Sequence, residues 1–217
     1  NFSMKKFISI SLFLLSYLVS FAQVQNYTFS ASSGTYTPIT GGTVVASGTT
    51  IDAFNSTAIN VAFTYNCTPV TSVRINADGH IGLGTYISTT NYTPLSGTIN
   101  ASVGILSVLG RDLASTDVVG ANSEIRYETI GNEFIVQWTD MRRSGTTGER
   151  INFQIRINTV TNDINYVYGP YTAGVANVNQ PQIGLKGTNN TFPTNVKNVT
   201  LACGGTGWIG VTAGTAN

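Results

Sequence analysis

The sequence predicts an all-β protein, a β-sandwich or jelly-roll whose strands are mostly antiparallel. Short apolar or alternating runs recur about every 8 to 12 residues, separated by Gly, Asn, Pro and Asp. After residue 22, no segment keeps a helical period over about 11 residues. Charged residues make up only 10% of the chain, whereas about 25% is usual. Thr, Asn, Ser and Gly take their place, a mixture that favours strands joined by polar turns.

Residues 1–22 are expected to be a signal peptide. We interpret residues 1–3, which precede Met4, as an upstream over-extension of the reading frame. Two lysines and an apolar run follow, and small residues occupy the −3 and −1 positions before Gln23. The apolar run is shorter than the ~20 residues that a spanning helix needs. We therefore expect a secreted or outer-cell-surface protein with no membrane span after cleavage.

The charge of the mature chain argues against polyanionic partners. The whole chain has 11 basic and 10 acidic residues, and the signal peptide contains Lys5 and Lys6. Cleavage leaves nine basic residues against ten acidic ones, a net charge of −1. Without a basic excess, neither nucleic acid nor an anionic membrane surface is an expected partner.

Residues 23–212 are expected to form one β-sandwich domain. The runs that predict its early strands are YTFSA (27–31), TVVAS (43–47), AINVAFTY (58–65), SVRINA (72–77) and HIGLG (80–84). Residues 101–114 are interpreted as a strand or a short helical turn that leads into a loop. Residues 213–217, small and polar, are expected to begin a linker to a downstream region.

The clearest pattern is a four-stranded meander between residues 124 and 168. EIRYETI and EFIVQW flank a turn at Gly131 and Asn132, which predicts a hairpin. INFQIRI then places its apolar side chains on one face and Asn152, Gln154 and Arg156 on the other. TND turns the chain into INYVYG, and QPQIGLKG and NVTLAC predict two further strands.

The stretch RINADGHIGLG (74–84) resembles part of a calcium loop and contains the only histidine of the chain. An EF-hand loop needs an acidic residue at its first position and a Glu at its twelfth, where this chain has Arg74 and Thr85. We therefore predict no metal site. Asp78 and Gly79 instead predict a two-residue type I′ turn, with His80 exposed or half-buried at the start of the return strand.

Two cysteines, Cys67 and Cys203, are the full complement of the chain. In an exported protein an even count favours a disulfide, so we expect these two to pair. Buried free thiols are the alternative. Two cysteines and one histidine are too few for a structural zinc site.

Six segments in order resemble an N-terminal domain of large secreted proteins of Bacteroidota. They are YTFSASSGTYTPITGGT, VRINADGHIGLG, SVLGRDL, EIRYETIGNEFIVQW, NFQIRINTVTNDINYVYG and QIGLKG. The resemblance covers roughly residues 27–215. It implies fibronectin type III repeats and a type IX secretion sorting domain downstream.

The nidogen-like extracellular domain is similar more loosely, through a hairpin followed by Trp138, the pair Phe153–Gln154 and the pair Tyr168–Gly169. Both resemblances imply an extracellular β-sandwich, and neither supplies a catalytic residue. The Bacteroidota family usually has an aromatic residue after the hairpin glycine, where this chain has His80.

The sequence does not predict an enzyme. It contains no phosphate-binding glycine loop, no GxSxG and no HExxH motif. Glu124 and Glu128 share a strand face at Cα positions about 13 Å apart, which is wider than the carboxylate spacing of glycosidases. Arg111 and Asp112 are interpreted as structural contacts at a strand end. No cofactor is expected.

We expect instead a non-catalytic recognition or adhesion module of a larger secreted or surface protein, with an extracellular glycan or surface protein as partner. A carbohydrate-binding accessory module of a secreted hydrolase and a structural spacer are the alternatives. The candidate binding residues are Arg142 and Arg143, in the loop DMRRSGTTGER, and Tyr86 and Tyr92, in loop-like sequence. Replacing both arginines with alanine is expected to weaken surface binding but to leave the melting temperature nearly unchanged. Tyr171 is also expected in a loop, whereas Trp138 and Tyr166 are expected in the core.

Overall fold

The computed structural model describes residues 24–86, 93–97, 101–175, 181–188, 196–198 and 214–216. These residues form a 3-10 turn, η1 (Val24–Asn26), and fourteen strands. The strands are β1 (Phe29–Ala31), β2 (Thr43–Ser47), β3 (Ile59–Tyr65), β4 (Thr68–Asn76), β5 (His80–Leu83), β6 (Gly104–Gly110), β7 (Leu113–Ser115), β8 (Glu124–Ile130), β9 (Glu133–Arg143), β10 (Arg150–Asn158), β11 (Ile164–Thr172), β12 (Gln182–Lys186), β13 (Val196–Asn198) and β14 (Gly214–Ala216). No α-helix occurs in this part of the chain, and the all-β prediction is confirmed.

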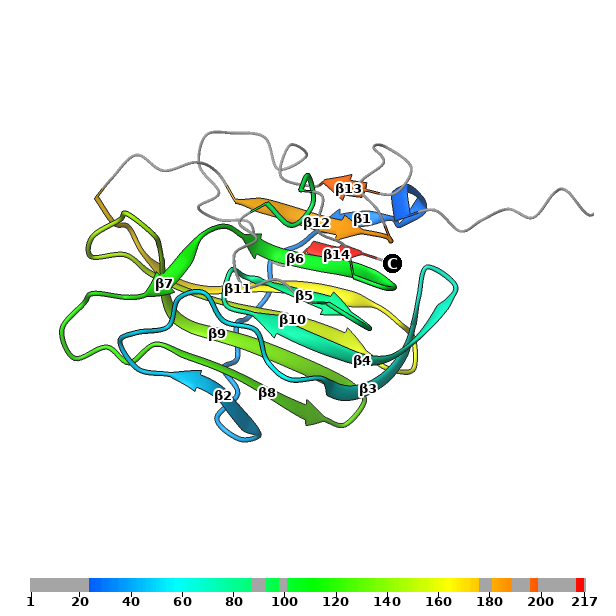
Figure 1. Cartoon of the computed structure of the whole chain (residues 1–217), viewed down its shortest axis with the longest axis horizontal. Coiled ribbons are helices and arrows are strands. Elements are labelled where there is room, and N and C mark those ends of the chain that lie inside the picture. Colours follow the sequence, from blue (N-terminus) through cyan, green and yellow to red (C-terminus); the bar gives the residue numbers. More distant parts are fainter. Residues whose placement is uncertain are drawn as a thin grey trace, which may run out of the picture.

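Two antiparallel sheets stack on each other (Figure 1). The larger has the order β1-β14-β11-β10-β9-β8-β2, with β7 added beside β9, and the smaller has the order β13-β12-β6-β5-β4-β3. The predicted meander is the run of neighbours β8 to β11, and β3 to β6 form a second meander in the other sheet. After β11 the chain returns to the smaller sheet, where β12 pairs with β6. The prediction of a β-sandwich is therefore confirmed.

The core lies between the inner faces of the two sheets. Trp138 is fully buried and stacks on Phe153, with ring centroids 5.1 Å apart. Its indole Nε1 donates to the carbonyl of Asn76 at 3.1 Å, a bond that joins β9 of one sheet to β4 of the other. Tyr166 is also buried, and its hydroxyl donates to the carbonyl of Gly184 at 2.7 Å. Both aromatic residues occupy the core, as predicted.

The β4–β5 hairpin forms where it was predicted, but its turn differs. Asn76 pairs with His80, so three residues rather than two make the connection. Only Gly79 of the three has a positive φ, 71°, which is the pattern of a three-residue hairpin loop. A Cβ at Gly79 would lie 2.4 Å from the carbonyl oxygen of Leu109, so the close approach of β6 also requires glycine.

A two-residue turn of the predicted kind connects β3 to β4 instead. Tyr65 pairs with Thr68, and the intervening Asn66 and Cys67 have φ of 49° and 58°. Both central residues are thus left-handed, as a type I′ turn requires. The sequence pattern missed this turn because Asn-Cys lacks the glycine that usually marks it.

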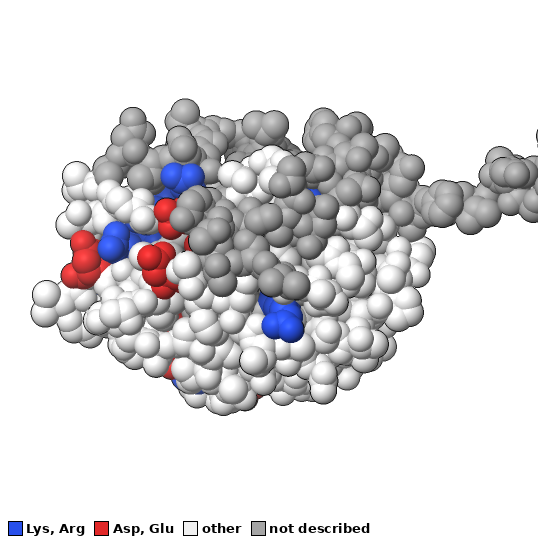
Figure 2. All heavy atoms as spheres, viewed as in Figure 1, with Lys and Arg blue, Asp and Glu red and all other residues white. Residues whose placement is uncertain are grey.

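Residues 101–114 contain β6, Gly104–Gly110, which is buried throughout, and the beginning of β7. Both faces of β6 are covered, because Leu106 and Val108 belong to the main core and Ile105 packs with Tyr86 in a second cluster, which explains why its sequence is largely apolar rather than alternating. On the face shown in Figure 2, most of the charged side chains in view lie toward the left end, with a basic side chain apart from them near the middle. Among the described residues, no helix is long and apolar enough to cross a membrane. The predicted signal peptide, residues 1–22, lies outside the described residues.

Candidate functional site

A segment between β1 and β2, residues 32–40, crosses the outer face of the larger sheet (Figure 1), and we call it the strap. Side chains of the sheet form hydrogen bonds with the backbone of the strap. The amide of Gln137 accepts from the backbone N–H of Ile39 at 2.8 Å and donates to the carbonyl of Ile39 at 3.2 Å. Gln154 and Arg156 both donate to the carbonyl of Thr37, at 3.0 and 2.9 Å. The strap is therefore fixed to β9 and β10.

A cleft of about 910 Å³ lies between the strap and the sheet, and we call it the strap cleft. Volumes of this size are typical of ligand pockets. Side chains of β8, β9, β10 and β11 line one side, and residues of the strap line the other. The lining residues used below are Tyr36, Glu124, Arg126, Thr139, Asp140, Arg150, Asn152, Gly169 and Thr172.

Asp140 lines the cleft from β9 in a left-handed conformation, with φ of 51°. The pairing of β9 with β10 shifts there, because Met141 lies opposite Ile151 whereas Trp138 lies opposite Phe153. β9 therefore contains one extra residue, a β-bulge that re-aims the side chain. Left-handed conformations are uncommon for residues other than glycine, although Asp tolerates them better than most.

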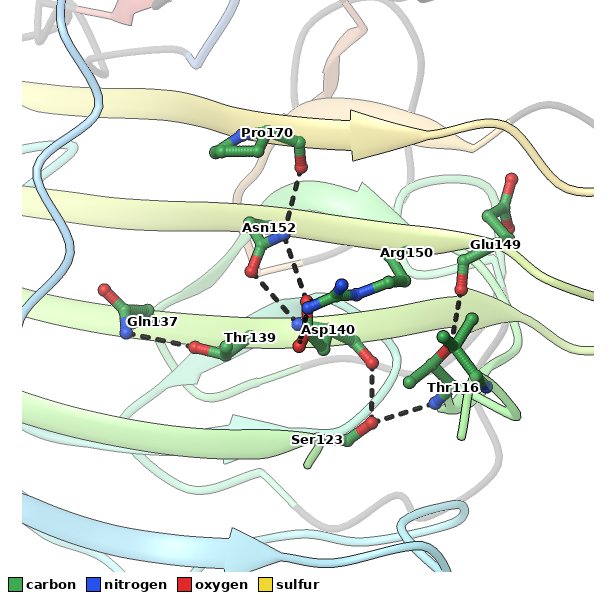
Figure 3. A network of polar contacts seen from close by, with 10 residues as sticks. Thr116, Ser123, Gln137, Thr139, Asp140, Glu149, Arg150, Asn152 and Pro170 are labelled. Atoms are coloured by element: carbon green, nitrogen blue, oxygen red, sulfur yellow. Dashed lines mark hydrogen bonds and ion pairs between the residues drawn. The ribbon is translucent and has the colours of Figure 1, made fainter. Parts of the chain in front are cut away.

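The side chain of Asn152 bridges this bulge and a second one in β11 (Figure 3). Its Oδ1 accepts from the backbone N–H of Asp140 at 3.1 Å. Its Nδ2 donates to the carbonyl of Pro170 at 3.0 Å. On the other side, Ser123 donates through its hydroxyl to the carbonyl of Asp140 at 2.6 Å. Asn152 and Ser123 thus replace strand bonds that the bulges interrupt, and they hold the backbone of the cleft wall.

The charges that line the cleft form pairs. Arg150 donates through Nε and Nη2 to the two carboxylate oxygens of Asp140, the first bond measuring 3.0 Å. Arg126 donates to Glu124 through Nε. These hydrogen bonds to a carboxylate raise the pKa of each guanidinium. These four residues therefore contribute polar groups to the lining but no net charge.

The two arginines predicted to bind a ligand, Arg142 and Arg143, both have contacts within the domain. Arg142 donates to the carbonyls of Ser115 and Thr146, at 2.8 and 3.0 Å. Arg143 donates to the carboxylate of Glu149, with Nη2 and Oε1 2.6 Å apart, and the Glu149 side chain is fully buried. Neither arginine lines the strap cleft. The expectation of a solvated loop is wrong, because these contacts fold the loop onto the sheet. We now expect replacement of Arg143 to lower the stability of the domain.

The predicted loop nevertheless supplies two residues of the cleft, Asp140 and Arg150, at its two ends. The sequence contained a sign of the bulge, since Asp is depleted in strands and Asp140 follows the apolar run EFIVQW. The strap had no such sign, because its contacts with Gln137 join residues 98 positions apart.

The predicted exposure of Tyr86 is wrong. Only 1% of this residue is exposed, and its hydroxyl lies 2.6 Å from His80 Nε2. A Cβ at Gly82 would lie 2.3 Å from the Tyr86 ring, so the ring packs directly on the backbone of β5. Tyr171 is only partly buried but belongs to β11 rather than to a loop, and its hydroxyl lies 3.3 Å from Glu149 Oε1. Tyr92 lies outside the described residues.

His80 is fully buried, rather than exposed or half-buried as predicted, because the Tyr86 ring meets it edge-on. Its Nδ1 lies 3.2 Å from the carbonyl of Asp78. Burial lowers the pKa of His80 to about 4, so the ring is neutral at pH 7. Within the described ranges no group of three or more His, Cys, Asp or Glu side chains is arranged to hold a metal ion.

The predicted disulfide is not present in the structure. Cys67 is a free cysteine, exposed at the tip of the β3–β4 turn. Cys203 lies outside the described residues.

The two acidic residues that were considered as a catalytic pair, Glu124 and Glu128, have different contacts. Glu124 pairs with Arg126, whereas the Glu128 side chain packs beside Gly41.

Stability is expected to depend on pH through Asp78 and His80 in opposite directions. Burial raises the pKa of Asp78 from 3.8 to about 7, so this group stabilises the fold below pH 4 and its contribution is lost as pH rises toward 7. His80 stabilises above pH 6.5, and its contribution is lost as pH falls toward 4. Between pH 4.5 and 6.5 the two slopes oppose each other, so we expect a shallow profile.

Asp78→Asn is expected to change that profile into one in which the free energy of unfolding rises with pH from 4.5 to 6.5. Asn keeps an acceptor for the Leu113 N–H but has no proton to lose. Asp112, whose pKa is raised by burial and by Asp52, also raises the pKa of Asp78 by its charge, and it is present in all of these proteins. Urea unfolding across this range measures the slope. His80→Asn is expected to have the opposite slope, and identical slopes in all three proteins would contradict the assignment.

The chain is similar to a known protein family. The model for the NIDO-related family matches residues 26–206, most of the chain. The chain belongs to this nidogen-related family. Membership indicates an extracellular domain, in agreement with the looser of the two resemblances drawn from the sequence. No curated protein and no solved structure matches the chain. The matched range includes every described residue that lines the strap cleft, from Gly34 to Thr172.

Proposed function

We propose that this nidogen-related domain is a non-catalytic recognition or adhesion module of a larger secreted or cell-surface protein, and that the strap cleft is its binding site. The observation that carries the proposal is the bulged wall of the cleft, together with the side-chain hydrogen bonds that hold it. A bulge is kept there, with Asp140 in an uncommon conformation, and Asn152 and Ser123 satisfy the backbone around it. Conformations of this kind concentrate at binding sites, where the surrounding structure maintains them.

The resemblance to the leading domain of secreted Bacteroidota proteins supports the larger context. In that context, fibronectin type III repeats and a type IX secretion sorting domain follow the module, and several modules on one surface strengthen weak individual binding. An accessory module of a secreted hydrolase is the second candidate, because the same cleft would serve it. The domains encoded beyond Asn217 separate the two: repeats with a sorting domain favour adhesion, and a hydrolase domain favours the accessory role.

Thr172→Trp is expected to abolish binding without unfolding the protein. Thr172 is exposed at the end of β11 and lines the cleft, so a tryptophan there fills the space that a ligand needs. The matched control is Val160→Trp, which adds the same bulk at an exposed position in the β10–β11 turn, away from the cleft.

Binding is measured on an array of purified extracellular-matrix proteins and polysaccharides, with the melting temperature recorded for each variant. Binding that Thr172→Trp removes and Val160→Trp retains supports the proposal. If both variants retain binding, recognition belongs to another surface. If the wild type binds nothing on the array, the domain is better explained as a structural spacer. Both of these outcomes overturn the proposal.

A further inference from the structure

The hydrogen-bonding groups of the strap cleft, together with one aromatic ring, identify a class of ligand. Resting on the function proposed above, we propose that the strap cleft binds a neutral saccharide, with its hydroxyl groups at Asp140, Arg150 and Thr139 and a sugar ring on Tyr36. Each part of this assignment follows from the geometry of the lining.

The paired charges select against a charged ligand. Arg150 lies against Asp140 and Arg126 against Glu124, so an anion that approaches either guanidinium also meets a carboxylate. Likewise, a cation that approaches either carboxylate also meets a guanidinium. A neutral ligand encounters neither repulsion, and its polar groups can use the remaining donors and acceptors of both pairs.

Those remaining donors and acceptors suit hydroxyl groups. Arg150 uses Nε and Nη2 for Asp140, and 40% of its side chain is exposed, which leaves its Nη1 edge to donate to a ligand. A carboxylate accepts up to about four hydrogen bonds, and Asp140 already accepts from Arg150 and Asn152, so with 10% of its side chain exposed it has room for about one more. Thr139 accepts from Gln137 Nε2 at 3.0 Å, so its own hydroxyl hydrogen is directed to another acceptor. A hydroxyl both donates and accepts, and it matches this mixture.

Tyr36 supplies a flat apolar surface beside these groups. A Cβ at Gly169 would lie 2.7, 2.8 and 2.9 Å from Cγ, Cδ1 and Cδ2 of Tyr36, so one face of the ring rests on Gly169 of β11. The residue is only partly buried and lines the cleft, and its other ring face is turned away from the strand. The C–H face of a pyranose packs on an aromatic ring in this way, while its hydroxyls point outward at the rim.

The test uses the whole domain and titrates named probes by calorimetry: neutral gluco-, manno-, xylo- and chito-oligosaccharides, and oligogalacturonate as the acidic probe. A neutral oligosaccharide is expected to bind, and its affinity should stay nearly constant between about 50 and 500 mM salt because no net charge is screened. Tyr36→Leu, which keeps an apolar side chain without a flat ring, should lower the affinity at least about tenfold. Val160→Ala, remote and exposed, is the control and should bind as the wild type does.

Gly169→Ala provides an independent variant that leaves every side chain of the cleft in the sequence. Its added Cβ displaces the Tyr36 ring, so binding of the same oligosaccharide should weaken while the domain remains folded by its melting curve. The inference is overturned if oligogalacturonate binds more tightly with strong salt dependence, if no neutral oligosaccharide binds, or if both variants bind as the wild type does. If the domain then binds a matrix protein and Thr172→Trp removes that binding, the proposed function still holds. If Thr172→Trp leaves that binding unchanged, both the proposed function and this inference are wrong.

Discussion

Arg143→Ala is expected to lower the free energy of unfolding by about 3–5 kcal/mol, the cost of removing one partner of a buried ion pair. Arg143 contacts both carboxylate oxygens of Glu149, which has no exposed surface of its own. Without the guanidinium, a charge stays in the interior with only neutral donors, from Thr146, Tyr171 and the Arg143 backbone. Urea unfolding at pH 7 measures the change.

The matched control is Glu133→Gln, which removes the carboxylate that pairs with Arg156. The side chain of Glu133 is 37% exposed, so this pair contributes only about 0–1 kcal/mol. The double variant Arg143→Met with Glu149→Gln should cost less than Arg143→Ala alone, since no buried charge remains. If Arg143→Ala proves as mild as Glu133→Gln, the loop is solvated after all and its arginines regain their place as candidate ligand contacts.

Tyr86→Ala is expected to destabilise the fold by about 3–5 kcal/mol, as large aromatic deletions in a core do. The ring packs on Gly82 and meets His80 edge-on, with centroids 5.5 Å apart. The deletion leaves a cavity over β5 and removes the hydroxyl that lies 2.6 Å from His80 Nε2. Denaturant unfolding measures this loss, and any loss of ligand binding by this variant is then a consequence of unfolding.

Tyr86→Phe separates the two contributions. It keeps the ring and removes only the hydroxyl, so it should cost about 1–3 kcal/mol for the unsatisfied buried nitrogen of His80. A stable Tyr86→Ala that loses saccharide binding would contradict the structural role and would return Tyr86 to the site.

The strands were predictable from the sequence because their patterns are local. INFQIRI alternates with period two, and Ile151, Phe153 and Ile157 are buried on the inner face as that period requires. Gly131 turns the β8–β9 hairpin with φ of 59°, as its position in the sequence suggested. The same local reasoning was wrong at Tyr86, because sequence composition says nothing about which segment folds over which sheet face.

Taken alone, the sequence determined the all-β class, the meander from β8 to β11, the position of the β4–β5 hairpin and the burial of Trp138 and Tyr166. Alternation, turn residues and aromatic composition act over a few residues, and each specifies its own element. Only the tertiary structure decided where a ligand site could form. The strap reaches Gln137 and Gln154 across separations of 98 and 117 residues, and the bulge at Asp140 exists because Asn152 of the next strand completes its hydrogen bonds. Contacts of that range depend on how the sheets and the strap pack, so no local pattern encodes them.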